Sequence, residues 1–130
     1  MTIKKKQEFK KSLLITSNIV HSKWLDRLNE LIDKHLGDPS LNNERLAAAL
    51  GLSERHLFRK IKEFTAVSPQ KYLSKYRLHR AKQYLEAGKY RTVKETSAAV
   101  GFRHTSYFIR RFEKEFGKKP LFVLRNAGWR

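Results

Sequence analysis

Residues 46–52 read Leu-Ala-Ala-Ala-Leu-Gly-Leu, and residues 96–102 read Thr-Ser-Ala-Ala-Val-Gly-Phe. The second stretch repeats the first at an offset of 50 residues, with small residues and then a glycine at matching places. After one inserted residue the repeat continues at an offset of 51, and it pairs Leu57, Arg59, Ile61 and Pro69 with Phe108, Arg110, Phe112 and Pro120. Because self-similarity at a fixed period marks a repeated structural unit, we expect two copies of one unit.

Capping and breaking residues divide the first copy into helix, turn and helix. Asn42 is a favourable N-cap for a helix over 43–50, and Ser53 for a helix over about 54–64. Gly51 lies between them and suits the left-handed conformation that ends a helix. The order predicts a helix-turn-helix motif.

The second copy has the same order of signals. Thr92 and Glu95 have the spacing of a capping box, in which each residue satisfies a free backbone N–H group of the other. The short helix that follows is expected to end at Val100, and Gly101 makes the turn. A second helix is expected over 105–116, so this copy also predicts a helix-turn-helix motif.

Three further helices are expected around these motifs. An apolar stripe at helical spacing begins at Trp24 and ends before Gly37, with Asn29 and Asp33 on its water-facing side. Ser68-Pro69 opens a helix that runs to about Ala87 and links the two motifs, and Lys119-Pro120 opens a last helix through residue 125. The fold class predicted is all-α, with about seven helices in two helix-turn-helix subdomains joined by a long linker helix.

The domain boundaries expected from these signals are an extension or linker over 1–22, a first subdomain over 23–67, a linker helix over 68–88 and a second subdomain over 89–130. The first core should contain Leu50, Leu57, Ile61 and Phe64. The second core should contain Val100, Phe102, Phe108, Phe112 and Phe116.

The positive charge is unevenly distributed along the 130 residues, which carry 29 Lys and Arg against 12 Asp and Glu, a net charge of +17. Residues 24–67 hold seven basic and seven acidic residues, whereas residues 68–130 hold 16 basic and four acidic ones. Solubility alone does not require such a bias, so the second half is expected to face a polyanion, with nucleic acid the first choice and an anionic membrane the second. A generally basic solvated surface is the alternative interpretation.

Composition argues against several other classes of protein. The chain has no cysteine, which excludes disulfides and thiolate metal sites, and no apolar run approaches the roughly 20 residues of a membrane span. There is no phosphate-binding loop, and the five histidines do not form a ligand pair at i,i+4. We expect no enzymatic activity, no catalytic residue, no metal and no cofactor, in a soluble cytoplasmic protein associated with the nucleoid.

The second helix of each motif carries the residues of functional interest. Arg55, Arg59, Lys60 and Lys62 are expected to face outward from the helix over 54–64. The N-terminal residues of such a helix can reach base edges in the major groove, where an arginine can hold guanine with two hydrogen bonds. Lysines and helix-start residues hold phosphates, and these contacts position the protein without reading sequence. The phosphate contacts expected are Ser53, Lys60, Lys62, Lys71, His104, Arg111, Lys114, Lys118 and Lys119.

The sequence resembles the AraC/XylS family of bacterial transcription regulators over about residues 24–125. In the first copy the resemblance rests on Leu46-Ala47, Gly51-Leu52-Ser53, His56-Leu57, Arg59, Ser68-Pro69, Tyr72-Leu73, Arg77-Leu78 and Ala81. In the second copy it rests on Val100-Gly101-Phe102, Ser106-Tyr107-Phe108, Arg110, Phe112, Phe116-Gly117 and Pro120.

The resemblance implies a regulator, usually an activator, that binds asymmetric promoter sites in double-stranded DNA and contacts RNA polymerase. Carried over by position, it implies that bases are read by Arg55, Phe58, Arg59, Arg103, Thr105, Ser106, Ile109 and Arg110. It also implies that a sensory domain can precede this unit in a longer protein. We hold a stand-alone regulator and an excised C-terminal piece as alternatives, with a slight preference for the second.

Several residues depart from the family pattern. Phe58 and Ile109 stand where a small polar residue is usual, which suggests contacts to methyl groups or a tighter dependence on DNA shape. Ala66 replaces a glycine, and Glu113 replaces a common lysine, which weakens a phosphate contact. Val123 and Leu124 follow Pro120 where an aromatic residue and then arginine are expected.

Two rival functions remain open. The chain can coat DNA without regard to sequence, through the basic second half, or it can serve as an adaptor whose first unit docks a protein. Replacing Arg55 and Arg59 by alanine separates them, because only a sequence-specific reader loses preference for its site more than general affinity.

Overall fold

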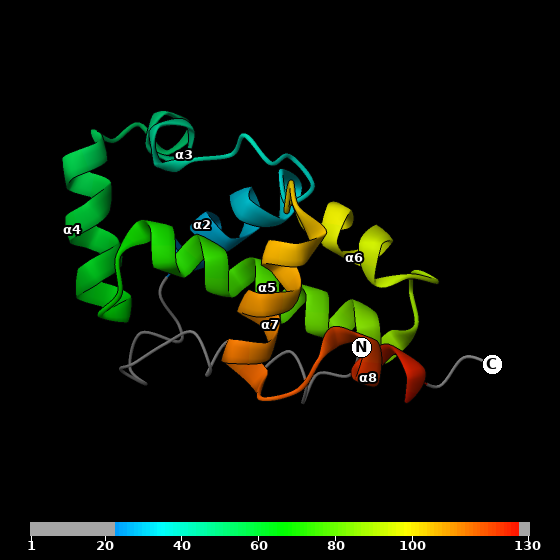
Figure 1. Ribbon diagram of the computed structural model, residues 1–130. Coiled ribbons are helices and arrows are strands. Elements are labelled where there is room, and N and C mark those ends of the chain that lie inside the picture. Colours follow the sequence, from blue (N-terminus) through cyan, green and yellow to red (C-terminus); the bar gives the residue numbers. More distant parts are fainter. Residues whose placement is uncertain (1–22, 128–130) are drawn as a thin grey trace. The chain divides into compact units, whose positions relative to one another are not determined.

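The computed structural model describes residues 23–127, and within that range the chain is helical, without strands (Figure 1). The all-α prediction is therefore confirmed. The expectation of a basic extension over 1–22 lies outside the described residues. The seven helices are α2 (Lys23–Lys34), α3 (Asn43–Leu50), α4 (Glu54–Thr65), α5 (Pro69–Ala87), α6 (Val93–Ala99), α7 (Thr105–Phe116) and α8 (Pro120–Arg125).

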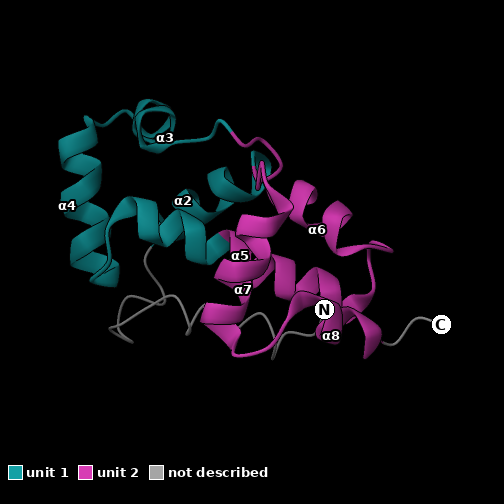
Figure 2. Ribbon diagram, viewed as in Figure 1, with its two compact units in different colours: residues 1–35, 40–76 teal, residues 36–39, 77–130 magenta. Residues whose placement is uncertain are grey.

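The chain divides into two compact units (Figure 2). Within the described residues, unit 1 comprises 23–35 and 40–76 with α2, α3 and α4, and unit 2 comprises 36–39 and 77–127 with α6, α7 and α8. The division falls inside α5, so this one helix contributes its first half to unit 1 and its second half to unit 2.

The expected caps of the first copy are present. The Asn42 side chain accepts a hydrogen bond from the backbone N–H of Arg45 at 2.9 Å. The Ser53 hydroxyl accepts from the backbone N–H of His56 at 3.1 Å, and Ser68 caps α5 in the same way. Gly51 ends α3 with a φ of 71°, the left-handed conformation expected of it.

The capping box of the second copy differs in one bond. Thr92 Oγ1 accepts from the backbone N–H of Glu95 at 3.0 Å, as expected. The Glu95 carboxylate, however, accepts a hydrogen bond from the Thr92 hydroxyl group rather than from its backbone N–H. The two short side chains thus pair with each other, and α6 starts at Val93 and ends at Ala99, one residue earlier than expected.

The core of unit 1 is built around α2. Leu25, Leu28 and Ile32 are buried there, with Leu57 and Ile61 of α4. Leu50 and Phe64 were expected in the same core but are half-buried. Phe64 lies at the edge of the core, where its ring packs on Trp24 with 5.5 Å between the ring centroids.

Two buried tyrosines of α5 add polar contacts to this core. The Tyr72 hydroxyl donates to Asn29 Oδ1 at 2.6 Å, and the Tyr76 hydroxyl donates to Asp33 Oδ2 at 2.8 Å. Burial raises the pKa of Tyr72 well above its usual value, so the phenol remains a donor. Asn29 and Asp33 therefore do not simply face water, as their place on the helix suggested, since they satisfy hydroxyl groups that would otherwise be buried unpaired.

The core of unit 2 is largely aromatic. Phe108 and Phe112 of α7 are fully buried, with Val100, as expected. Phe102 and Phe116 were expected in the same core but are half-buried. They pack on the edges of the two buried rings, with centroid distances of 5.1 Å from Phe102 to Phe108 and 4.6 Å from Phe116 to Phe112.

The turn of unit 2 is closely packed. Gly101 is buried with a φ of +89°, and a Cβ atom there would overlap the backbone oxygen of Leu36 and lie 2.9 Å from Nε of Arg77. Nη2 of Arg77 donates to the backbone oxygen of Asp38 at 2.8 Å. Burial lowers the pKa of Arg77, and the charge of Asp38 opposes that shift. Arg77 thus joins segment 36–39 to the turn that precedes α7.

No helix among the described residues has both the length and the apolar character needed to cross a membrane. In the same range, no cluster of three or more His, Asp or Glu side chains is suited to hold a metal ion.

Candidate nucleic-acid interface

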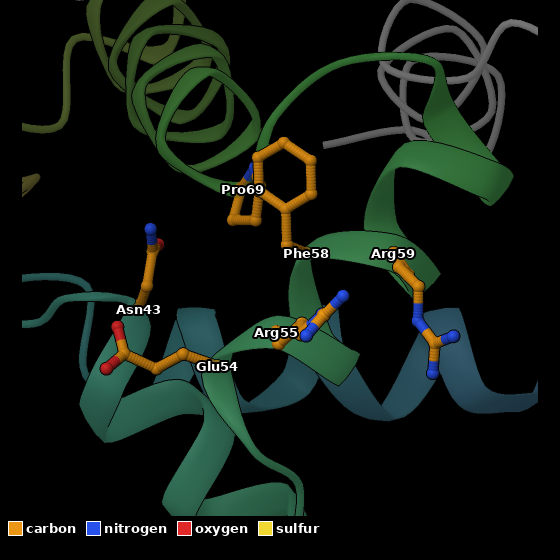
Figure 3. Close-up of a pocket in the computed structure, with 6 residues that line it drawn as sticks. All are labelled: Asn43, Glu54, Arg55, Phe58, Arg59 and Pro69. Carbon is orange, nitrogen blue, oxygen red and sulfur yellow. The ribbon is translucent and has the colours of Figure 1, made fainter.

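The exposed face of α4 forms one side of a groove of about 460 Å³ in unit 1 (Figure 3). The groove lies between the start of α3, α4 and the start of α5, and it is lined by Asn43, Glu54, Arg55, Phe58, Arg59 and Pro69. The Ser53 cap fixes where α4 starts, and buried Leu57 and Ile61 fix which face of the helix turns inward. The three expected base-reading residues of this unit therefore share one surface.

Two cations dominate this groove. Arg55 and Arg59 are exposed, and within the described chain neither side chain has a hydrogen bond or an ion pair. Figure 3 shows the Phe58 ring directed toward Pro69 and the Arg59 guanidinium group pointing away from that proline. Both groups are thus free to bind an external acceptor, and an arginine matches guanine or phosphate through two parallel hydrogen bonds.

Unit 2 presents the corresponding face of α7. Arg103, Ser106 and Arg110 are exposed, and Thr105 and Ile109 are half-buried. A groove of about 370 Å³ adjoins this helix, lined by Arg91, Thr92, Val93, Ile109, Lys119, Pro120, Leu121 and Leu124. Thr105, Ser106, Ile109 and Arg110 lie along the first two turns of α7, and Arg103 lies in the segment just before this helix.

Tyr107 is a residue of this face that sequence reasoning missed. Its side chain is 47% exposed, and the Arg110 guanidinium carbon lies 5.9 Å from its ring centroid. The spacing of three residues between Tyr107 and Arg110 places both on one side of a helix, and that spacing was the available signal. The tyrosine ring supports the arginine and presents a hydroxyl group beside it.

The expected phosphate contacts fall into two groups. Those on the surface are Ser53, Lys62, Lys71, His104, Lys114, Lys118 and Lys119. The Ser53 hydroxyl already accepts the capping hydrogen bond of α4, and its proton remains available to donate.

Lys60 and Arg111 are less accessible, since each is half-buried. Nζ of Lys60 lies 4.6 Å from the centroid of the Trp24 ring, so this lysine packs toward α2 and not on the outward face of α4. Nε of Arg111 is buried without a hydrogen-bond partner, so only the tip of this side chain can meet a phosphate.

The two grooves occupy equivalent places in the sequence repeat. At the offset of 51, Phe58 corresponds to Ile109 and Pro69 to Pro120, and each member of these pairs lines its own unit's groove. A capped helix, a glycine turn and an exposed second helix with arginine define each unit as a helix-turn-helix module for nucleic acid. The class of protein is therefore a tandem helix-turn-helix domain.

The comparisons with known proteins agree with this class. A family model described as "Helix-turn-helix domain" matches residues 46–126. The chain is 31% identical over 99 residues to the bifunctional transcriptional activator/DNA repair enzyme AdaA of Bacillus subtilis, covering 76% of this chain and 46% of that protein.

Two solved structures share the fold. The C-terminal domain of AraT, a response regulator from Geobacillus stearothermophilus, has a TM-score of 0.72 and 28% identity, over 84% of this chain and 89% of that one. The DNA-binding domain of AdpA, a global transcriptional factor solved in complex with a target DNA, has a TM-score of 0.69 and 26% identity, over 78% of this chain and 89% of that one.

The chain belongs to the AraC/XylS family of DNA-binding, helix-turn-helix transcription regulators. It spans less than half the length of the curated relatives it matches, for example 46% of AdaA.

Proposed function

We propose that this chain binds promoter DNA sequence-specifically, with α4 and α7 reading two adjacent major grooves. The observation that carries the proposal is the pair of exposed arginines on α4 whose side chains have no partner within residues 23–127, with a second exposed face at the equivalent place on α7. Arg55, Phe58 and Arg59 read bases from unit 1. Arg103, Thr105, Ser106, Ile109 and Arg110 read bases from unit 2.

The length of α5 supports a two-groove site. Its 19 residues, at about 1.5 Å per residue, extend for roughly 28 Å as one continuous helix. Successive major grooves on one face of B-DNA recur at about 34 Å. A helix of this length shared by both units suits a monomer that reads two half-sites of an asymmetric sequence.

We further propose that the chain activates transcription through RNA polymerase and works as the output domain of a longer signalling protein. The relatives favour this role, since AdaA is named a transcriptional activator and AraT a response regulator. Transcription in vitro from a promoter carrying the selected site tests it. Added chain should raise transcript yield, and an unchanged or lower yield would contradict activation.

The experiment for DNA reading is selection from a random duplex library, followed by titration of the enriched pool at two salt concentrations. We expect an asymmetric motif with two blocks about one helical turn apart. The double variant Arg55→Ala/Arg59→Ala should lose preference in one block by about 10-fold or more, because each bidentate pair with guanine contributes roughly 1–3 kcal/mol of discrimination.

A matched control removes the same charge elsewhere in unit 1. The double variant Arg27→Ala/Lys34→Ala removes two exposed cations from α2. This variant should bind all DNA sequences more weakly by the same factor, and it should leave the selected motif unchanged. A protein that coats DNA without reading it would give no enriched motif and an equal, sequence-blind loss in both double variants. An adaptor would keep its DNA affinity in both.

A further inference from the structure

Helices α4 and α7 each carry a large apolar side chain at equivalent positions that remain partly open to solvent. Phe58 is 46% exposed at the centre of the α4 face, while Leu57 and Ile61 of the same helix fill the core. Ile109 stands at the equivalent position of α7 and is half-buried. Leaving part of a large apolar side chain exposed forgoes part of its burial energy, so this placement, most pronounced at Phe58, favours contact with an external apolar group.

Hydrogen-bond donors flank both apolar side chains. Arg59 follows Phe58 and Arg110 follows Ile109 in the chain, and both arginines are exposed. Arg55 lies three residues before Phe58, and Ser106 lies three residues before Ile109, each on the same helix face as the apolar side chain. Each face therefore presents an apolar patch between polar donors, and it is bounded by a buried proline, Pro69 in unit 1 and Pro120 in unit 2.

The major groove offers one apolar group to such a patch. Its base edges carry hydrogen-bond donors and acceptors, except for the C5-methyl group of thymine. A methylated cytosine carries the same group at the same carbon. An arginine beside the patch suits a neighbouring guanine, whose O6 and N7 atoms both accept.

We propose that Phe58 and Ile109 are specificity-determining residues that each bind the 5-methyl group of a pyrimidine, one in each half of the DNA site. Arg59 and Arg110 bind guanine beside that pyrimidine. This inference rests on the proposed function. It adds the chemical group that each helix selects, and it makes binding sensitive to methylation wherever cytosine occupies the position.

The test removes only the methyl group from the DNA. In the selected duplex, each thymine is replaced in turn by deoxyuridine, and affinity is measured by fluorescence anisotropy. The affinity of the wild-type chain should fall about fourfold at one position in each half-site, which corresponds to the burial of one methyl group. Phe58→Ala should abolish the difference between thymine and uracil in one half-site only, and Ile109→Ala in the other only.

Two further variants separate reading from folding. Phe58→Leu keeps an apolar side chain and should keep a preference for thymine over uracil. Phe122→Ala removes an exposed phenylalanine of α8, 58% exposed and outside both reading helices, and should leave that preference intact. A purely structural role for Phe58 would lower affinity for both duplexes equally, without changing their ratio, and would overturn the proposal.

A cytosine arm distinguishes the two sources of the methyl group. If a duplex with 5-methylcytosine at this position binds more tightly than one with cytosine by about the same factor, the chain recognises the methyl group on either base. If the two duplexes bind equally, the chain recognises the methyl group of thymine alone. If uracil at every position leaves the affinity of the wild-type chain unchanged, methyl recognition is overturned, while sequence-specific binding still stands. Failure to enrich any motif would instead remove the proposed function, and this inference with it.

Discussion

The glycine turns before the two reading helices look alike in sequence and differ in packing. Gly51 is exposed, and a Cβ atom there would meet nothing within 4 Å, whereas Gly101 is buried against the backbone of Leu36 and the side chain of Arg77. Both adopt positive φ, at 71° and 89°. The glycine of unit 1 is thus needed only for its positive φ, whereas the glycine of unit 2 is needed for its positive φ and for the close approach of its neighbours.

The helix ends after the reading helices differ in the opposite sense. Ala66 ends α4 with a φ of 62°, and Gly117 ends α7 with a φ of 72°. The same left-handed position therefore holds a strained alanine in unit 1 and a relaxed glycine in unit 2. Unit 1 tolerates this substitution because Ala66 is exposed and its Cβ raises only the backbone energy.

The reading faces differ in charge. Arg55 and Lys62 of α4 correspond to Ser106 and Glu113 of α7 at the repeat offset. The common backbone plan therefore presents a cationic face in unit 1 and a mixed face in unit 2. The basic excess of the chain lies in its second half, so most of the positive charge of unit 2 is carried by residues outside the centre of this face.

The largest expected effect on stability comes from adding a side chain at the two glycine turns. Gly101→Ala should destabilise the protein by about 3 kcal/mol or more, because it adds overlap with the Leu36 backbone to left-handed strain. Gly51→Ala should reduce the free energy of unfolding by only about 1 kcal/mol, since it adds backbone strain alone. Urea unfolding monitored by circular dichroism measures both, and equal losses would show that packing at Gly101 contributes nothing.

The next effect concerns the two equivalent arginines. Arg59→Ala and Arg110→Ala should each relax preference at one base pair by about 1–3 kcal/mol, in different halves of the site. Competition binding with single-base variants of the selected site measures the two losses separately. If both variants relaxed the same half, the assignment of one helix to each groove would be wrong.

A smaller effect sharpens the comparison of the helix ends. Ala66→Gly should stabilise the protein by about 0.5 kcal/mol, because relief of left-handed strain exceeds the added entropy of the unfolded chain. Gly117→Ala should destabilise it by about 1 kcal/mol. Thermal and urea denaturation of the two variants give the signs, and a destabilising Ala66→Gly would contradict the strain.

The smallest effect exchanges charge between the reading faces. Glu113→Lys should strengthen binding to all sequences and steepen the dependence of log affinity on log salt by about one unit, the contribution of one phosphate contact. Lys62→Glu should do the reverse. Titrations on random-sequence DNA over a range of salt concentrations measure the slope, and an unchanged slope would place both residues away from phosphates.

Local signals were sufficient to predict the helices. Asn42, Ser53 and Ser68 cap helices where expected, and α3, α5, α7 and α8 have the bounds that the sequence indicated. These features depend on residues within one helical turn of each other, so a linear pattern contains them. The limits of the cores were less predictable, because the helical stripe does not show which positions lie at its edge, as Phe64 and Phe116 do.

Contacts between distant residues were not predictable in this way. The hydrogen bond from Tyr72 to Asn29 joins residues 43 apart, and that from Arg77 to Asp38 joins residues 39 apart. Nothing near Asn29 in the sequence indicates that a buried phenol will need an acceptor there. Tyr107 was missed for a related reason, since an aromatic residue beside Phe108 looks like core until the helix is seen in place.

The sequence by itself determined the two helix-turn-helix units, their helix ends and the cationic character of α4, because caps, breakers and the internal repeat act over short distances. Only the tertiary structure decided that Arg55 and Arg59 have no partner within the described chain, that Lys60 packs on Trp24, and that Phe58 lies beside Pro69 in an open groove. Those facts depend on which surfaces meet when helices pack, and helix packing is set by contacts that no local pattern records.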